Sequence, residues 1–307
     1  MKKIILLPII CLMWMAGYSQ QHPMLSQYMF NGLILNPAYA GSKDYISAGM
    51  LYRKQWVEFE GAPVTQTAFI HGPLKSRKVG IGFSLINDKI GVTNRTDAYG
   101  SYAYHLKVSD AGKLSMGLQA GISYYSAKLS DLVYWDKSDP VFAEDVQTNL
   151  LPNAGAGLYY YEKKFYAGLS VPHLLSYDPQ KSLSFEVEKV PRTVRHYFFS
   201  SGYVVEVNDD FKIKPSVLVK YVPDAPMEFD INCNVLLANT FWIGASYRTG
   251  DAVVGIIEYQ ITRKMRLGYS YDATISDMRN HSSGSHEIML GYDFGYDIMK
   301  MKTPRYF

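Results

Sequence analysis

The segment Lys113–Tyr125 alternates between two kinds of side chain along its whole length. One side of an extended chain would carry Leu114, Met116, Leu118, Ala120, Ile122 and Tyr124, and the other would carry Ser115, Gly117, Gln119, Gly121 and Ser123. A period of two predicts a β-strand with one apolar and one polar face. Because the strand is long and its polar face is built from small residues, the pattern favours a transmembrane barrel, in which lipid-facing and lumen-facing residues alternate.

Similar segments, each bounded by turn residues, recur along the chain. We expect strands at Ile46–Trp56, Thr65–Gly72, Val79–Ile86, Asp97–His105, Lys113–Tyr125, Ala154–Tyr161, Phe165–Val171, His196–Val205, Lys212–Tyr221, Met227–Leu236, Thr240–Arg248, Ala252–Gln260, Lys264–Asp272 and His286–Phe294. The sequence therefore predicts an all-β fold, a single transmembrane antiparallel β-barrel of about 14 strands over residues 46–295, with an ordered N-terminal segment and long extracellular loops.

Charged side chains in these strands fall on the polar face. They are Lys214, Lys220, Glu228, Asp230, Arg248, Arg266, Asp272 and Asp293. Since charges are tolerated in a water-filled lumen and are costly against lipid, we expect all of them to face a wet lumen. We expect His105, His173 and His196, which fall at strand ends, to contact water as well.

The lengths of the connections alternate along the series of strands. The even-numbered connections are all short, whereas the odd-numbered ones include the longest, Asn87–Thr96, Ser126–Asn153, Pro172–Arg195 and Ala273–Ser285. Barrels of this kind have short periplasmic turns and long external loops. This alternation predicts that the N-terminal segment, residues 20–45, and the C-terminal tail, residues 296–307, both lie in the periplasm.

The first 19 residues have the three parts of a secretory signal peptide. Lys2 and Lys3 form a positive region, residues 4–16 are apolar, and Gly17 and Ser19 supply the small residues near a cleavage site. We expect cleavage of residues 1–19. A permanent membrane anchor is the alternative, but the apolar run is shorter than the ~20 residues needed to span a bilayer.

Composition supports an exported membrane barrel over other classes. The chain contains 26 tyrosines, many of them near predicted strand ends, where barrels carry aromatic girdles. The net charge of +3 is too small to indicate a nucleic-acid partner. Cleavage of the signal peptide would leave Cys233 as the only cysteine, which excludes an intrachain disulfide.

Candidate groups for catalysis or metal binding do not form a recognisable motif. His281, His286 and Glu287 match no zinc spacing, and a polar loop that runs into a strand explains them equally well. A lipid-acting barrel enzyme would need a serine and a histidine in contact, but Ser200 and His196 are four residues apart on one strand. We therefore expect no enzyme activity, no catalytic residues, no cofactor and no metal.

Several blocks of sequence resemble the PorP/SprF family of type IX secretion system membrane proteins, in the family's order, from about Gln27 to Phe307. They include SQYMFNGLILNPAYAGS, YRKQW, GAPVTQ, GIGFSLINDKIG and SSGSHEIMLGYDF. The matching positions include Gln27, Tyr28, Asn31, Asn36, Pro37, Tyr39, Gly41, Arg53, Gln55, Trp56, Pro63, Asp88, Gly91, His286 and Glu287. Gly32 followed by Leu33 is a mild departure, because relatives often carry proline there.

The resemblance implies an integral outer-membrane barrel of a Bacteroidetes-type bacterium that works with the type IX secretion or gliding apparatus. It implies three kinds of partner: a secreted surface protein with a C-terminal sorting domain, periplasmic secretion components or a peptidoglycan-binding protein, and outer-membrane lipid. A diffusion porin is the alternative function. It would share the polar interior and the long loops.

Two hypotheses concern where partners bind. The aromatic residues Tyr134, Trp135, Phe142 and Phe185 in the long loops could anchor the exported client, or these loops could simply close the mouth of the barrel. Residues 26–42 and the tail could form a periplasmic docking face, or residues 26–42 could plug the lumen. The plug is favoured because Tyr28, Phe30, Leu33, Leu35 and Tyr39 are too apolar to leave exposed.

Overall fold

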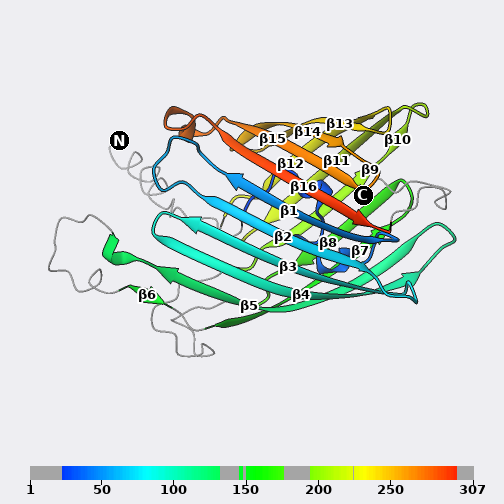
Figure 1. The fold of residues 1–307 in the computed structure, drawn as a ribbon, viewed down its shortest axis with the longest axis horizontal. Coiled ribbons are helices and arrows are strands. Elements are labelled where there is room, and N and C mark those ends of the chain that lie inside the picture. Colours follow the sequence, from blue (N-terminus) through cyan, green and yellow to red (C-terminus); the bar gives the residue numbers. More distant parts are fainter. Residues whose placement is uncertain (1–22, 132–144, 148–149, 176–193, 224, 296–307) are drawn as a thin grey trace, which may run out of the picture.

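The computed structural model describes residues 23–131, 145–147, 150–175, 194–223 and 225–295 (Figure 1). The predicted signal peptide and C-terminal tail lie outside these ranges. Within them the chain forms a closed antiparallel barrel of fourteen strands, in which β1 pairs with β16 and β9 pairs with β11. No helix among the described residues is long and apolar enough to cross a membrane.

The wall is built from strands in sequence order. They are β1 Ile46–Lys54, β2 Val64–Pro73, β3 Val79–Ile90, β4 Thr93–Lys107, β5 Lys113–Ala127, β7 Leu151–Tyr161, β8 Phe165–Val171, β9 Tyr197–Tyr203, β11 Phe211–Tyr221, β12 Glu228–Leu237, β13 Phe241–Arg248, β14 Ala252–Gln260, β15 Met265–Thr274 and β16 Ser285–Phe294. Two short strands extend this wall: β6 (Val146–Gln147) pairs with the end of β5, and β10 (Val205–Glu206) continues β9.

Four 3-10 turns complete the described elements. They are η1 Tyr28–Phe30, η2 Pro37–Tyr39, η3 Leu129–Asp131 and η5 Asp277–Asn280.

The ends of the strands form two rims. We call the loop rim the one joined by residues 55–63, 91–92, 128–150, 172–196, 222–227, 249–251 and 275–284, and the turn rim the one joined by residues 74–78, 108–112, 162–164, 207–210, 238–240 and 261–264.

All fourteen predicted strands are present, and the prediction of a membrane barrel is confirmed. The predicted long loop Asn87–Thr96 is wrong, because β3 continues to Ile90 and β4 begins at Thr93. The Asn87 side chain bridges the two strands, donating to the Asn94 and Thr96 side chains at 2.8 Å each. These cross-strand bonds let polar residues extend the ladder where the alternation with apolar residues has stopped.

The two faces of the wall differ as the alternation predicts. On β5, Ser115 and Gln119 are buried against the interior, whereas Met116 and Leu118 are 42% and 64% exposed on the outer face. Outward-facing apolar residues recur around the whole barrel, and they include Ile231 on β12 and Ile288 on β16. This apolar outer surface suits lipid rather than water.

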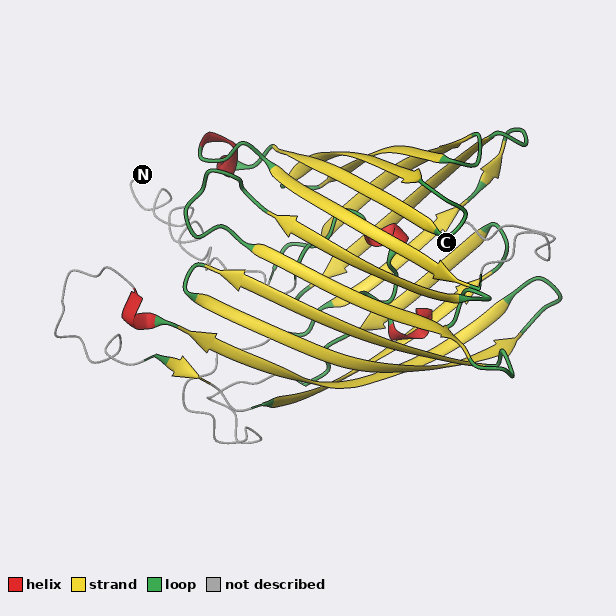
Figure 2. Ribbon diagram, in the orientation of Figure 1, coloured by secondary structure: helices red, strands yellow, loops and turns green. Residues whose placement is uncertain are grey.

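Residues 23–43, which we call the plug, lie inside the barrel, and η1 and η2 are visible there in Figure 2. Leu33 is 1% exposed, and Ala38 and Ala40 are fully buried. The apolar core of the protein is therefore formed by the plug together with inward-facing side chains of the wall, such as Phe69 and Tyr159.

The plug corrects one expectation about topology. The alternation of loop lengths alone placed the whole segment 20–45 on the side of the short turns, whereas its apolar side chains favoured a plug in the lumen. Instead, Ser26 bonds to Arg53 and Asp272 at the loop rim, whereas Lys43 bonds to Ser47 at the turn rim. The segment crosses the lumen because β1 begins at the turn rim, while the partners of Ser26 lie at the other end of the barrel.

Glycines on the inner face allow the plug to approach the backbone of the wall. A Cβ at Gly117 would lie 2.1 Å from the backbone nitrogen of Ala38, and one at Gly157 would lie 2.1 Å from the Asn36 side-chain oxygen. A Cβ at Gly80 would lie 2.0 Å from the carbonyl oxygen of Ala40. Since only glycine fits against a backbone this close, these positions fix where the plug sits.

We expect Gly117→Val to destabilise the barrel by about 1–3 kcal/mol, the usual cost of overpacking an interior. The unfolding temperature can be read from the loss of the compact band in semi-native electrophoresis. Gly100→Val is the matched control, because Gly100 is exposed on the outer face of the neighbouring strand and a Cβ there meets nothing nearer than 3.9 Å. Equal unfolding temperatures for the two variants would contradict this account of the packing.

Candidate functional site

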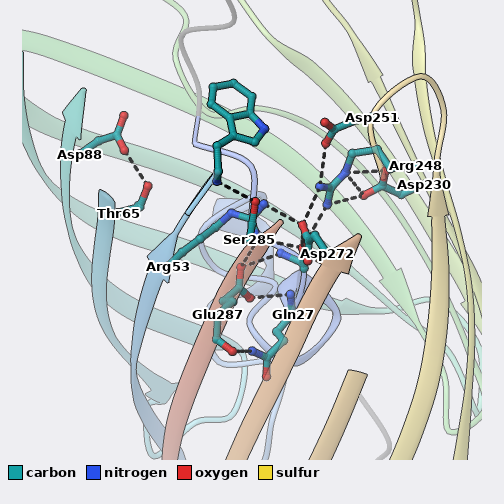
Figure 3. A network of polar contacts seen from close by, with 12 residues as sticks. Gln27, Arg53, Thr65, Asp88, Asp230, Arg248, Asp251, Asp272, Ser285 and Glu287 are labelled. Atoms are coloured by element: carbon teal, nitrogen blue, oxygen red, sulfur yellow. Dashed lines mark hydrogen bonds and ion pairs between the residues drawn. The ribbon is translucent and has the colours of Figure 1, made fainter. Parts of the chain in front are cut away.

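The first residues of the plug are held by a buried charge cluster at the loop rim, which we call the rim network (Figure 3). It contains Ser26, Gln27, Arg53, Asp230, Arg248, Asp251, Asp272 and Glu287. These residues come from the plug, from β1, β12, β13, β15 and β16, and from the turn after β13. Their side chains meet because each charged member except Asp251 occupies an inward-facing position near the loop end of its strand.

Glu287 binds the plug through the backbone. The Ser26 and Gln27 amides donate to its two carboxylate oxygens at 2.8 and 2.7 Å, and the Gln27 side chain donates to its carbonyl at 3.2 Å. Arg53 adds an ion pair to the same carboxylate at 3.2 Å. A fully buried carboxylate is costly unless donors surround it, and here the plug supplies two of the three.

Asp272 lies between the two arginines of the rim network. Arg53 and Arg248 approach it at 2.7 and 3.2 Å, and the Ser26 hydroxyl donates to it at 2.7 Å. Arg248 also pairs with Asp230 at 3.1 Å and with Asp251 at 3.2 Å. Both arginines are 1% exposed, so the rim network connects five strands and the plug in a site shielded from water.

Polar side chains of the wall hold the middle of the plug by its backbone. The Ser170 hydroxyl donates to the Leu35 carbonyl at 2.6 Å, and the Ser115 hydroxyl donates to the Ala38 carbonyl at 2.7 Å. In the other direction, the Asn36 side chain donates to the backbone of β7 at 2.9 Å. Its oxygen also accepts from the Ala38 amide, which caps η2 at the turn begun by Pro37.

Aromatic residues surround two side chains in the lumen. The Tyr39 ring makes edge contacts with His71 and Tyr159, with ring centroids 5.2 and 5.4 Å apart. The Lys214 ammonium lies 5.9 Å from the Phe30 ring, 5.7 Å from Tyr166 and 5.8 Å from Trp242. These cation–π contacts offset part of the cost of burying a lysine and attach Phe30 of the plug to three strands.

A second charge cluster holds the end of the plug at the turn rim. Arg266 pairs with Asp293 at 3.0 Å, and the Ser47 hydroxyl donates to the same carboxylate at 2.6 Å. Lys43 of the plug donates to Ser47 at 3.4 Å. The plug is therefore fixed by charged groups at both rims and by packing between them.

A cavity of about 30 Å³ lies beside the plug, among residues of η1, η2, β7, β8, β9 and β11. Tyr28, Asn36, Tyr159 and Tyr166 are among its lining residues. This volume suits one or two water molecules. It is far smaller than the pocket that a small-molecule ligand requires.

The positions that carry the family resemblance in the sequence fall into two groups in the structure. Gln27, Tyr28, Asn31, Asn36, Pro37, Tyr39, Gly41, Arg53 and Glu287 form or contact the plug, and all of those with a side chain are buried. Gly41 has a positive φ of 70°, and its amide donates to His71 at 3.2 Å. The second group, Gln55, Trp56, Pro63, Asp88, Gly91 and His286, lies at or near the loop rim.

The loop-rim group orders the connection between β1 and β2. The Gln55 amide donates to the Pro63 carbonyl at 2.9 Å, and the Trp56 amide donates to a hydroxyl at the start of β16 at 3.1 Å. The Gly91 amide donates to the tip of the same loop at 2.8 Å. Asp88 accepts a 2.6 Å bond from Thr65. These bonds join three neighbouring connections into one ordered edge.

His286 and Glu287, considered above as possible metal ligands, lie on opposite faces of the wall. The His286 Nδ1 lies 2.7 Å from the Tyr269 hydroxyl on the outer face, whereas Glu287 points inward. Among the described residues no group of three histidine, cysteine, aspartate or glutamate side chains is placed to hold a metal. His281 is exposed in the connection before β16.

The expectation of a wet lumen is wrong for most of its charges. Lys214, Arg248 and Asp272 are at most 1% exposed, and His105 and His196 are also buried. The alternation had placed these side chains inward correctly, but the periodicity of a strand carries no information about what fills the space opposite. The Ser170, Ser115 and Lys214 contacts to the plug were missed for the same reason.

The proposed client-binding residues Tyr134, Trp135, Phe142 and Phe185 lie outside the described residues. Next to them, Asp145 is described and exposed. The Ser130 amide and hydroxyl both donate to its carboxylate, at 3.1 and 2.8 Å, and these bonds lower the pKa of Asp145. An ionised carboxylate is therefore present at the base of this loop.

Comparisons with known proteins give a family and a set of distant structural likenesses. The family model of the type IX secretion system membrane protein PorP/SprF matches residues 17–292. A search of the curated proteins finds no match. Among solved structures, Omp33 of Acinetobacter baumannii is 11% identical over 83% of this chain and 100% of its own, with a TM-score of 0.46. A Pseudomonas aeruginosa FadL homologue is 12% identical over 89% and 95%, with a TM-score of 0.45.

We expect Arg53→Met to lower the free energy of unfolding by about 3–5 kcal/mol, because it leaves the buried Glu287 carboxylate without its cationic partner. Urea titration of the barrel in lipid vesicles measures this change. Lys107→Met is the control. It breaks an exposed ion pair with Asp110, whose contribution is at most about 1 kcal/mol. A similar small effect for both variants would show that the rim network does not hold the plug.

Proposed function

The chain belongs to the PorP/SprF family of type IX secretion system membrane proteins, and we propose that it is a closed, non-enzymatic outer-membrane barrel that helps to secrete or anchor a surface protein bearing a C-terminal sorting domain. The observation that carries this proposal is the filled lumen. A barrel whose interior is packed with its own chain is suited to hold a partner at its surface rather than to conduct solutes.

The partners proposed for the two rims differ. We place the client at the loop rim, where Tyr134, Trp135, Phe142 and Phe185 would supply aromatic anchors and Asp145 a charged neighbour. Periplasmic secretion components, or a peptidoglycan-binding partner, would meet the turn rim and the tail 296–307. This orientation follows the usual rule that long loops face outward. Export by the predicted signal peptide, residues 1–19, is part of the proposal.

Retention of the client on the cell surface tests the proposal. Deleting the protein from its host should release a surface protein with a C-terminal sorting domain into the medium or prevent its export. Expression of the full chain should restore that surface protein to the cell surface. Deleting residues 132–144 should leave a folded barrel in the outer membrane and lose the client. The Lys107→Met variant, altered at the turn rim, should retain it. An unchanged surface level in the absence of the whole protein would refute an anchoring role.

The alternative function, a diffusion porin, requires an open lumen. We expect the full chain to give no steady conductance in a planar bilayer, because the plug packs against the inner wall between the two rims and the cavity beside it holds only about 30 Å³. Removal of residues 23–43 should create a conducting pore. Semi-native electrophoresis identifies preparations that have folded. A steady open pore from the intact, folded chain would favour the porin over a closed anchor.

A further inference from the structure

The path of the plug indicates which side of the membrane the start of the folded chain faces. We propose that the plug, residues 23–43, crosses the barrel once, so that Pro23 faces the compartment of the long loops while the chain leaves β16 toward the opposite compartment. The chain would then cross the membrane once more than its strands do. The two ends of the described chain, Pro23 and Gly295, would face different sides, unlike those of a barrel with an even number of crossings.

The leading end of the plug is fixed at the loop rim. Ser26 bonds to Arg53, which lies one residue before the end of β1, and to Asp272, which lies two residues before the end of β15. It also accepts from Arg248, the last residue of β13, at 3.3 Å. All three strands end at the loop rim. Four independent bonds from Ser26 and Gln27 to Glu287 and Asp272 therefore set the position of this end.

Later plug residues contact the wall progressively nearer the turn rim. The Asn36 side chain bonds to Leu158, three residues before β7 ends at the turn rim. The Ala38 carbonyl accepts from Ser115, only two residues after β5 begins at the turn rim. The Ala40 carbonyl contacts the His105 ring at 3.0 Å, near the turn-rim end of β4. The order of contacts along the plug matches the order of depth along the wall.

The length of the plug is sufficient for this crossing. Even at the ~2 Å rise per residue of a 3-10 helix, the chain from Gln27 to Lys43 spans more than the ~25 Å apolar band of a membrane barrel. The plug precedes β1 in the sequence, and β1 closes the barrel against β16. The closed wall therefore encloses a segment that precedes all of its strands in the sequence.

The crossing determines from which side of the membrane a partner can reach the start of the folded chain. Pro23 and Met24 are partly exposed, and they precede the residues held by the rim network, at the rim where connections 55–63 and 275–284 also lie. A partner on the loop-rim side can reach this end of the plug without entering the barrel. A partner on the turn-rim side cannot reach it, because the packed lumen separates them.

Epitope tags inserted one at a time into the full chain test the proposal. The test tag lies between His22 and Pro23. Reference tags lie between Asn280 and His281, in an exposed connection of the loop rim, and between Lys75 and Ser76, in an exposed turn of the turn rim. Antibody binding is compared between intact and permeabilised cells, and semi-native electrophoresis shows that each tagged barrel has folded.

We expect the test tag to behave like the 280/281 tag and to bind antibody at least tenfold better on intact cells than the 75/76 tag does. Agreement of the test tag with the 75/76 tag would overturn the proposal. A ratio of antibody binding on intact to permeabilised cells midway between those of the two reference tags would mean that the test tag is reached equally from both sides. That result would also overturn the proposal. Because the comparison is between two rims of one barrel, its result is independent of whether the protein anchors a client.

Discussion

The charges on the inner wall are the constraint on which the rest of the structure depends. A barrel of this size can hold water or protein in its lumen, and a charge buried by protein needs a partner. Here Glu287 and Asp272 take part of their shell of donors from the Ser26 and Gln27 backbone and side chains. Wall and plug are therefore interdependent, since each satisfies groups that the other would bury without a partner.

This interdependence also explains the chemistry of the lumen. The wall presents hydroxyls and imidazole rings to the plug backbone. Ser115 and Ser170 donate to the Ala38 and Leu35 carbonyls, and His71 accepts from the Gly41 amide. A plug of short 3-10 turns leaves many of its backbone carbonyl and amide groups without a partner inside the plug, because its turns contain few internal hydrogen bonds. A polar inner face thus solvates an irregular chain in place of water.

The sequence predicted those features of the fold that depend on local periodicity. Strand β14 begins and ends at its predicted residues, and the inward position of Arg248 follows from alternation alone. The site could be predicted only in part. Tyr39 and Phe30 are apolar enough to suggest a buried plug, but the bond between Ser26 and Asp272 joins residues 246 apart. Such a contact depends on the stagger of the whole barrel, which no local pattern encodes.

The plug is fixed rigidly within the barrel. Glycines at positions 80, 117 and 157 place the plug within backbone contact of the wall, so a shift of the plug along the lumen would bring backbone against side chains. The charge clusters at both rims oppose the same movement. A plug fixed at both ends and in the middle cannot act as a freely sliding gate. The surfaces left for recognition are therefore the rims and the outer wall, because the described interior is already packed.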